Sequence, residues 1–499
     1  MSNNEDDDHL GAFKLKVIDH FQVSPPQGSV PTSSLPLSFF DFPFLVSSQT
    51  RRIFFYEFPY STNHFLETVI PCLKQSLSLS LQHFFPFAAN LVFPTKPKKP
   101  HIHYVDDATS SSIPFTVAES TLDFNHLVAD YSRDISDIYP LVPKMPPALA
   151  LEDDTLLFPL MAIQVTVMSN SGFAIGTNFH HIVGDGMAFH HFMKTWASAS
   201  NRLIRKKAPS ESREVEEEEE GIHNSLPIFN DGSMVQDPNG VELCFLNHWW
   251  NWGPKVLLMV GSARAGQHLT IDLLEVKATF KLDKNHIDKL KHWISHKSQE
   301  AKEKEELASL RLSTFVVTCA LIWICLAKSE QNTNMENEDE ELYHFGFLAN
   351  CRSRYEFLSI PWTYFGNCVA PGYVTLKRRK LVGENGIVEA AKAIRNKVKE
   401  LEKDGVLRGA ERWLLEGMEK AKSKHHFVIA GSPKLSVYET DFGWGKPIKS
   451  EVIHDRGSVS ISLSDCREKN SGGIEVGVGL GRDQMNHFAE IWEQSLRML

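Results

Sequence analysis

The chain has 499 residues, 42% of them hydrophobic and 23% charged, which is the composition of a globular protein large enough for more than one domain. The formal net charge of -10 argues against nucleic acid or an anionic membrane as the main partner, although a local basic patch could still bind a small polyanion. The seven cysteines have no CxxC spacing and several lie in apolar runs, so we expect reduced thiols.

The N-terminus, MSNNEDDDHL, is acidic and polar, so it is expected to be neither a secretory signal nor a transit peptide. The longest apolar run, FVVTCALIWICLA at 315–327, is too short to span a bilayer and is predicted to form a buried helix. We therefore expect a soluble, cytoplasmic protein with no membrane partner.

Short alternating strands interleaved with amphipathic helices predict an α/β fold. The segment MAIQVTVMSNSGFAIGTNF, at 161–179, predicts a β-hairpin, and from Met187 onward the apolar period becomes helical. Residues 206–240 contain few apolar side chains and include the run EVEEEEE at 214–220, which predicts a solvated, disordered insertion.

The second half of the chain repeats the same alternation of strands and helices. VKATFKL at 276–282 predicts a strand, residues 387–403 an amphipathic helix, and the polar segment 329–341 disorder. We therefore expect two α/β domains, at 1–205 and 266–499, joined by a polar crossover connector at 206–265. Clefts between such domains commonly hold ligands.

The segment FAIGTNFHHIVGDGMAFHHF, at 173–192, concentrates four histidines and an aspartate. Strand alternation places His181 at the end of a strand, on its mostly apolar face, where α/β folds carry chemistry. His180 faces the other way, and Asp185 is expected to cap the next helix or to fix the loop. His190 and His191 fall on or beside the polar face of that helix and would not converge with His181, so we expect ordinary helix positions there.

Several functions compete for this histidine cluster. A zinc site needs three or four ligands with recognisable spacing, and the HExxH motif is absent. Nucleophilic catalysis is disfavoured because the sequence has no GxSxG elbow. A single histidine with a pKa of about 6.5 suits a general base that deprotonates a hydroxyl or amine as it attacks an activated acyl carbon. A purely structural histidine remains an alternative.

The segment ETDFGWGKP, at 439–447, predicts a tight loop in which Gly443 and Gly445 flank Trp444. HHIVGD followed by DFGWG resembles the BAHD family of plant acyl-CoA-dependent acyltransferases, whose hallmarks are HxxxD and DFGWG. YFGNC, at 364–368, is similar to the branch that acylates anthocyanins and other flavonoid or phenolic glucosides.

The resemblance implies a monomer with two chloramphenicol-acetyltransferase-like domains, each a mixed β-sheet flanked by helices, and a channel at their interface. It implies that His181 is the general base and that Asp185 pairs with Arg352 or Arg354. Asp441 is a second catalytic candidate by this resemblance, although its place in a Gly-flanked loop favours a structural role, shared with Gly443, Trp444 and Gly445.

The resemblance also implies acyl-CoA as a co-substrate, without a cofactor or a metal. Ser313 and Thr314 begin the apolar helix, where the positive end of the helix dipole favours a phosphate. They are predicted to bind CoA together with Arg264, and the basic run at 377–380 is a further candidate.

Malonyl-transferring members often carry an arginine directly after the HxxxDG segment, where this chain has Met187. The missing charge leaves a more neutral pocket, compatible with a hydroxycinnamoyl or a short aliphatic acyl group, and favours a hydroxycinnamoyl donor over malonyl. The expected acceptor is a sugar hydroxyl of a flavonoid or phenolic glycoside. The alternatives are a metal-dependent hydrolase that uses the histidine cluster and a non-catalytic small-molecule-binding homologue.

Overall fold

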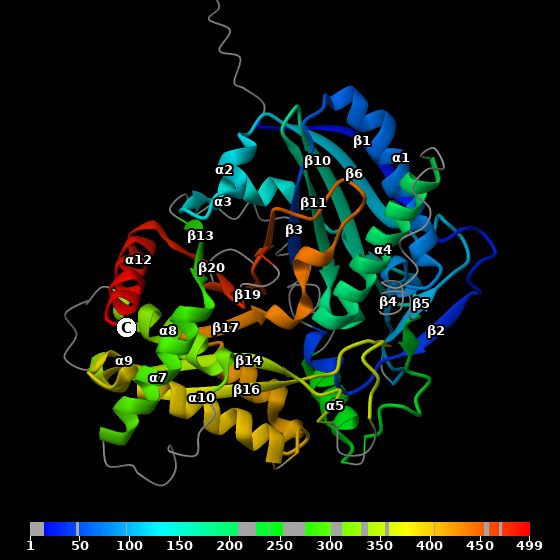
Figure 1. Ribbon diagram of the computed structural model, residues 1–499. Helices are drawn as coiled ribbons and strands as arrows, with labels where there is room; N and C mark the ends of the chain where they lie inside the picture. Colours follow the sequence, from blue (N-terminus) through cyan, green and yellow to red (C-terminus); the bar gives the residue numbers. More distant parts are fainter. Residues whose placement is uncertain are drawn as a thin grey trace, which may run out of the picture.

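The computed structural model describes residues 14–45, 49–95, 97–207, 226–237, 239–252, 275–300, 312–330, 338–354, 359–403, 405–453, 459–468 and 472–499. The acidic N-terminal residues, the glutamate run at 214–220 and Arg264 lie outside the described residues. Two large sheets flanked by helices dominate the fold (Figure 1), and each contains both parallel and antiparallel neighbours, which confirms the predicted mixed α/β class.

The first sheet has six strands in the order β1-β6-β10-β11-β3-β18. Their bounds are β1 Leu15–Val23, β6 Ile113–Ser120, β10 Met161–Met168, β11 Gly172–His180, β3 Gln49–Glu57 and β18 Lys449–Ile453. The predicted hairpin is the β10–β11 pair. Helices α1 (Thr62–Leu81) and α4 (Gly186–Lys207) lie together beside this sheet (Figure 1), and the Trp196 indole donates to the Leu73 carbonyl between them at 3.1 Å.

A second apolar cluster covers the other face of the first sheet. It joins Ile53, Phe55 and Ala174 of the strands to Phe124 and Leu127 of helix α2 (Phe124–Val128). The short helix α3 (Ile135–Ile138) and the 3-10 turn η3 (Tyr139–Leu141) complete this layer. Both faces of β3 and β11 are therefore buried, which makes these strands rigid supports for the residues at their ends.

The second sheet has seven strands in the order β16-β14-β17-β19-β20-β13-β7. Their bounds are β16 Val369–Lys377, β14 Leu342–Asn350, β17 His426–Gly431, β19 Ser460–Asp465, β20 Ile474–Gly481, β13 Glu275–Leu282 and β7 Arg133–Asp134. Five helices gather around it (Figure 1), namely α7 Lys284–Glu300, α8 Thr314–Ser329, α9 Arg378–Val382, α10 Gly386–Lys403 and α12 Arg482–Arg497. The predicted buried helix is α8, whose residues from Val316 to Ala327 are all buried.

Each large sheet contains one strand from the opposite half of the chain. β18 comes from the C-terminal half and pairs with β3, while β7 comes from the N-terminal half and pairs with β13. The connector is also less polar than expected, because it contains helix α5 (Val241–Trp252), whose Phe245 and Trp249 are buried. The domain boundaries at 205 and 266 stay a prediction. The exchanged strands β18 and β7 connect each large sheet to the other half of the chain.

The remaining elements are short. A five-stranded sheet has the order β2-β5-β4-β9-β8, with bounds β2 Ser33–Pro36, β5 His101–Tyr104, β4 Asn90–Phe93, β9 Leu156–Pro159 and β8 Leu149–Ala150. A pair of two-residue strands, β12 (Ile228–Phe229) and β15 (Tyr364–Phe365), joins the connector to the C-terminal half. Helix α11 spans Trp413–Lys420, and the other 3-10 turns are η1 Phe42–Phe44, η2 Phe85–Ala88, η4 His181–Val183, η5 Glu338–Glu340, η6 Ala410–Arg412, η7 Pro433–Leu435 and η8 Val437–Glu439.

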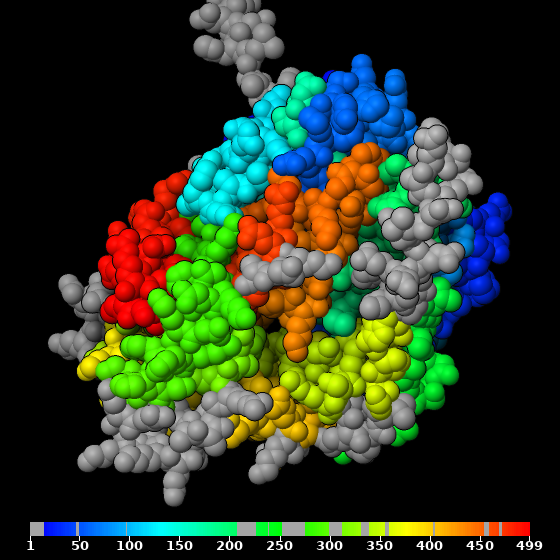
Figure 2. Space-filling model, in the orientation of Figure 1, coloured from blue at the N-terminus to red at the C-terminus, as the bar shows by residue number. Residues whose placement is uncertain are grey.

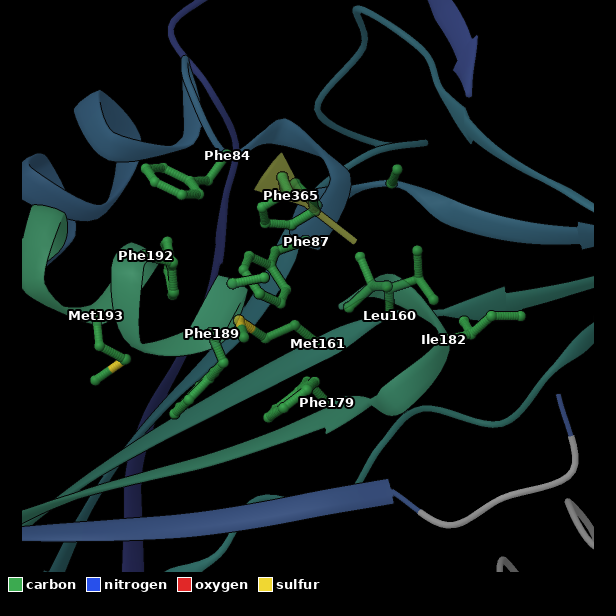
Figure 3. Close-up of a cluster of buried hydrophobic side chains, with 14 of the residues drawn as sticks. Phe84, Phe87, Leu160, Met161, Phe179, Ile182, Phe189, Phe192, Met193 and Phe365 are labelled. Carbon is green, nitrogen blue, oxygen red and sulfur yellow. The ribbon is translucent and has the colours of Figure 1, made fainter. Parts of the chain in front are cut away.

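An aromatic cluster fixes the C-terminal segment YFGNC against the N-terminal helix α4. Phe365 packs among Phe84 and Phe87, with ring centroids 5.9 and 5.3 Å apart, next to Phe192 of α4 (Figure 3). The segment at 364–368 is thereby held beside the turn that follows β11. Among the helices that the structure describes, none combines the length and the apolar character needed to cross a bilayer.

Candidate active site

His181 begins the 3-10 turn η4, directly after β11 ends at His180. β11 lies between β10 and β3 inside the first sheet, so the backbone that leads into this turn is firmly held. The ring of Phe44 stacks on the imidazole, with centroids 4.0 Å apart and planes at 15°. The predicted position at the end of a strand is therefore the observed one.

The imidazole of His181 is half-buried and chiefly neutral at physiological pH. Burial lowers the pKa of His181 below its usual range, although the charge of Asp185 and a hydrogen bond to Asn367 act in the opposite direction. A neutral imidazole can accept a proton, which is what a general base requires.

Asn367 is the side chain that contacts the imidazole, since its Oδ1 lies 3.1 Å from Nδ1 of His181. It is fully buried in the segment YFGNC, and it also donates from Nδ2 to the carbonyl oxygen of His181 at 2.9 Å. YFGNC resembles a family signature, but Asn367 was not predicted as a site residue. The sequence signal that could have identified Asn367 is a single amide side chain in an otherwise apolar segment, because such a group needs hydrogen-bond partners once it is buried.

Asp185 forms a buried ion pair with Arg352, with Oδ2–Nη1 and Oδ1–Nη2 distances of 2.7 and 3.1 Å. Its Oδ1 also accepts from the backbone N–H of Met187 and Ala188, at 3.0 and 3.1 Å, and so caps α4. Its Oδ2 accepts from the backbone N–H of Cys368 at 3.1 Å. One carboxylate thus fixes the start of α4, the end of the YFGNC segment and the guanidinium at once.

Arg354, the other arginine considered as the partner of Asp185, lies elsewhere. Its Nη2 is 3.0 Å from Glu402 Oε1, and both side chains are partly exposed. Arg352 is instead buried and also donates to the carbonyl oxygen of Tyr364 at 3.1 Å. The structure therefore selects Arg352.

The DFGWG loop lies beside the C-terminal half of α4. Asp441 Oδ1 accepts from the backbone N–H of Gly443 and Gly445, at 2.8 and 3.1 Å. Both glycines have positive φ, of 103° and 99°, which side-chain-bearing residues rarely adopt. The Ser200 hydroxyl of α4 donates to the Phe442 carbonyl at 2.8 Å. In Figure 2 the orange part of the chain, which includes this loop, lies between the blue N-terminal and the yellow-green C-terminal regions.

This placement separates Asp441 from His181. Ser200 lies 14 residues after the first residue of α4, so the loop contacts the helix roughly 20 Å from the turn at His181. Trp444 packs edge-on against Phe173, with centroids 6.3 Å apart, near the start of β11 and not at its end. The geometry favours a structural role for Asp441, Gly443, Trp444 and Gly445.

Among the residues predicted to bind CoA, Arg264 lies outside the described residues, and no described contact brings Ser313, Thr314 or the basic run at 377–380 to His181. Ser313 caps α8, accepting from the Val316 N–H at 3.3 Å, and Thr314 is the first residue of that helix. Lys377 and Arg379 both pair with Glu340, and Lys380 pairs with Glu389 at 3.1 Å. Two carboxylates thus pair with three of the four cations in the basic run at 377–380.

His190 and His191 are buried, so the prediction that they lie on or beside a polar face of the helix is wrong. His190 Nε2 lies 3.2 Å from Arg52 Nη1, and burial together with that charge holds the pKa of His190 well below its usual range. His191 packs between Phe84 and Trp362. The reason is that α4 is covered on more than one side, which a single apolar stripe does not reveal. Within the described ranges, no three His, Cys, Asp or Glu side chains are grouped to hold a metal ion.

Comparison with known proteins adds independent information. Residues 13–495 match the Transferase family. The chain is 38% identical over 490 residues to coumaroyl-CoA:anthocyanidin 3-O-glucoside-6''-O-coumaroyltransferase 1 of Arabidopsis thaliana, covering 97% of each chain. It is 37% identical over 493 residues to malonyl-coenzyme A:anthocyanin 3-O-glucoside-6''-O-malonyltransferase of Dahlia pinnata, again covering 97% of each.

Solved structures support the fold. The crystal structure of vinorine synthase superimposes with a TM-score of 0.61 at 18% identity, covering 95% of this chain and 96% of that one. TRI101 of F. graminearum, complexed with coenzyme A and T-2 mycotoxin, gives a TM-score of 0.59 at 14% identity, covering 93% and 98%. At such identities the likeness concerns the fold alone.

Proposed function

The chain belongs to the Transferase family of BAHD acyl-CoA-dependent acyltransferases, and we propose that it transfers an acyl group from acyl-CoA to a sugar hydroxyl of an anthocyanin or related flavonoid glucoside. Relatives at 38% and 37% identity are named for such acceptors. The observation that carries the proposal is the neutral imidazole of His181 at the end of β11, held by Asn367 and by the stacked ring of Phe44.

In the proposed reaction, Nε2 of His181 accepts the proton of the acceptor hydroxyl as its oxygen attacks the thioester carbonyl carbon. The tetrahedral intermediate then collapses, the C–S bond breaks, and the imidazolium returns the proton to the departing thiolate of CoA. A thioester is activated enough for direct transfer, so no acyl-enzyme is formed. Asp185 and Arg352 contribute by fixing the turn that carries His181, because both are buried and Asp185 holds the backbone N–H groups of Met187 and Cys368.

The donor is proposed to be a hydroxycinnamoyl-CoA. Relatives at nearly equal identity are named for coumaroyl and for malonyl transfer, so overall similarity does not decide the donor. The residue after the HxxxDG segment, Met187, lies in the first turn of α4, is half-buried and packs against the apolar core. An uncharged thioether there suits an aromatic acyl group better than a carboxylate.

Several further properties belong to the same proposal. We keep Ser313, Thr314 and Arg264 as proposed contacts of the CoA phosphates, and we propose a cytoplasmic monomer that uses acyl-CoA as a co-substrate without a cofactor. Ser313 and Thr314 are partly exposed at the N-terminus of α8, where an anion is favoured.

The test is direct transfer in vitro. Purified protein is incubated with p-coumaroyl-CoA and an anthocyanidin 3-O-glucoside. Released CoA is measured with a thiol reagent, and the mass of the product is measured by mass spectrometry. We expect a glucoside heavier by one coumaroyl group and one equivalent of released thiol. Thiol release without an acylated glucoside would indicate a thioesterase, and loss of activity on treatment with a chelator would favour the metal-dependent hydrolase.

A further inference from the structure

A buried carboxylate lies behind the contact between Asn367 and His181. Asp41 precedes the turn η1 and is only 6% exposed. Its Oδ1 accepts from the backbone N–H and from Nδ2 of Asn367, at 3.2 and 2.9 Å. Its Oδ2 accepts from the backbone N–H and the hydroxyl of Ser38, at 2.7 and 2.8 Å. Four donors therefore compensate a charge whose burial is otherwise unfavourable.

The partners of Asn367 determine which way its amide points. Nδ2 lies 2.9 Å from Asp41 Oδ1, 2.9 Å from the His181 carbonyl oxygen and 3.3 Å from the Ile182 carbonyl oxygen. Carbonyl and carboxylate oxygens can only accept, so the amide nitrogen must face them. If the amide were flipped, its oxygen would face these three acceptor oxygens, and it would be repelled most strongly by the negative charge of Asp41.

This orientation determines the tautomer of His181. With Nδ2 committed, Oδ1 of Asn367 faces Nδ1 of the imidazole at 3.1 Å, and an amide oxygen accepts a hydrogen. The proton of the neutral ring is therefore on Nδ1, and the lone pair is on Nε2. A ring with the opposite tautomer cannot take a proton at Nε2, so selecting the tautomer selects the active base.

We propose that Asp41 is a positioning residue for the reaction, acting through Asn367 to keep His181 in the Nδ1-protonated tautomer. The proposal rests on the proposed function only for its kinetic readout. The same short segment also fixes the plane of the ring, because Phe44 donates its backbone N–H to the Asp41 carbonyl at 2.9 Å and stacks on the imidazole. Residues 41, 181 and 367 thus form one chain of contacts across both halves of the sequence.

Few other groups near this chain of contacts change charge near neutral pH. Tyr364 and Cys368, which face Asp41, have pKa values raised by burial and stay uncharged. Arg352 also has a raised pKa and stays cationic beside Asp185. Asp41 itself has its pKa raised by burial to about 6, against the hydrogen bonds from Asn367 and Ser38, so it is chiefly ionised at pH 7.

The experiment compares Asp41→Ala, Asn367→Ala and the double variant. We expect Asp41→Ala to lower kcat about ten- to a hundredfold while changing the KM of acyl-CoA little, because proton transfer is affected and not substrate binding. In the Asn367→Ala background the same change should lower kcat no further. Asp41→Asn, which keeps an oxygen for Asn367, should recover much of the loss.

A second readout is independent of activity. The pKa of His181 is measured in each variant from the exchange of the imidazole C2 hydrogen, followed by mass spectrometry of the peptide that contains it. Without Asp41 the Asn367 amide is free to turn its oxygen away from Nδ1, and losing that acceptor should lower this pKa in Asp41→Ala. The acid limb of the pH–rate profile should move the same way. The control is Asp465→Asn, a partly buried carboxylate that accepts from the Val437 N–H at 2.9 Å and should shift neither quantity.

The possible outcomes separate the two proposals. An unchanged kcat and an unchanged His181 pKa in Asp41→Ala would overturn the positioning role, as would losses that multiply in the double variant. If the wild-type protein transfers no acyl group, the proposed function fails, and the His181 pKa alone decides the role of Asp41. If Asp41→Ala does not fold, the same comparison is made between Asn367→Ala and the wild type, where a His181 pKa and a kcat both equal to the wild type reject the proposal.

Discussion

The guanidinium of Arg352 lies 2.7 Å from the carboxylate of Asp185, and both side chains are almost completely buried. Asp185 belongs to the turn after β11 in the first sheet, and Arg352 follows β14 in the second. The pair therefore joins the two sheets next to His181. Because Asp185 also caps α4 and binds the Cys368 N–H, losing either partner would release several backbone groups at the proposed active site.

The first prediction compares the two arginines. Arg352→Ala leaves the buried Asp185 without its counter-charge and should lower the free energy of unfolding by about 3–5 kcal/mol. Arg354→Ala removes the partly exposed pair with Glu402 and a 3.4 Å hydrogen bond to the Asn350 carbonyl oxygen, and it should lower the free energy of unfolding by about 1 kcal/mol or less. Urea unfolding of both variants, with acyl-transfer assays, makes the comparison. Equal effects would mean that the buried pair has no special importance.

The second prediction concerns His181. His181→Ala should lower kcat by about 10²–10⁴-fold, because the imidazole that accepts the proton is lost. The protein should stay folded, because the side chain is only half-buried. The matched control is His180→Asn, which keeps an acceptor for the Ile182 N–H that His180 Nδ1 holds at 3.3 Å. Full turnover by His181→Ala would eliminate the general-base mechanism.

The third prediction separates structure from chemistry at Asp441. Asp441→Ala should destabilise the loop by about 1–2 kcal/mol, because two backbone N–H groups lose their acceptor. Asp441→Asn keeps Oδ1 as an acceptor and should retain most of the stability and activity. If Asn were as damaging to kcat as Ala in a folded protein, the carboxylate would take part in the chemistry after all.

The period of apolar residues along the sequence predicted the strand that leads to His181, the hairpin and the buried helix. Strand alternation alone placed His181 at the end of β11, and the hairpin and the buried helix α8 were found by their period and composition. The resemblance to the BAHD family, and not a local pattern, narrowed the arginine partner of Asp185 to two residues. It could not choose between them, because the direction of the chain after β14 is set by the fold and not by the sequence NCRSR itself.

Long-range contacts could not be predicted in this way. Asp41 and Asn367 are separated by 326 positions in sequence, and neither carries a pattern that points to the other. β7 has only two residues, too few to show a period, so its membership of the second sheet was not foreseeable. The burial of His190 follows from packing against Arg52 and Phe54 of β3, which is likewise non-local.

The fourth prediction tests the donor. The wild-type protein should use p-coumaroyl-CoA with a higher kcat/KM than malonyl-CoA. Met187→Arg should raise the malonyl-to-coumaroyl ratio of kcat/KM about tenfold, because a charge-assisted hydrogen bond contributes roughly 1.5–3 kcal/mol. Met187→Leu, which conserves volume, should leave the ratio unchanged. A wild-type preference for malonyl-CoA would show that Met187 does not control the choice of donor.

The fifth prediction uses the pH dependence of stability at Asp41. The pKa of Asp41 is about 6 in the folded protein, against its ordinary value of 3.8 in an unfolded chain. The folded state therefore favours the protonated carboxyl, and this contribution to stability is lost as the pH rises through about 6. Asp41→Asn is uncharged at every pH. The free energy of unfolding of the variant minus that of the wild type should therefore increase between pH 4 and pH 8, by on the order of 1–3 kcal/mol.

Urea unfolding at pH 4, 5, 6, 7 and 8 measures this difference. The control is Asp107→Asn, since hydrogen bonds from Thr109 and Ser110 lower the pKa of the Asp107 carboxyl. Its contribution to stability is present above its ordinary pKa of 3.8 and is lost only below that pH, so the difference between this variant and the wild type should stay nearly constant between pH 5 and pH 8. If the difference in free energy of unfolding between Asp41→Asn and the wild type stays constant with pH, the pKa of Asp41 is the same in the folded and the unfolded chain. Ionising Asp41 next to Asn367 would then carry no energetic cost.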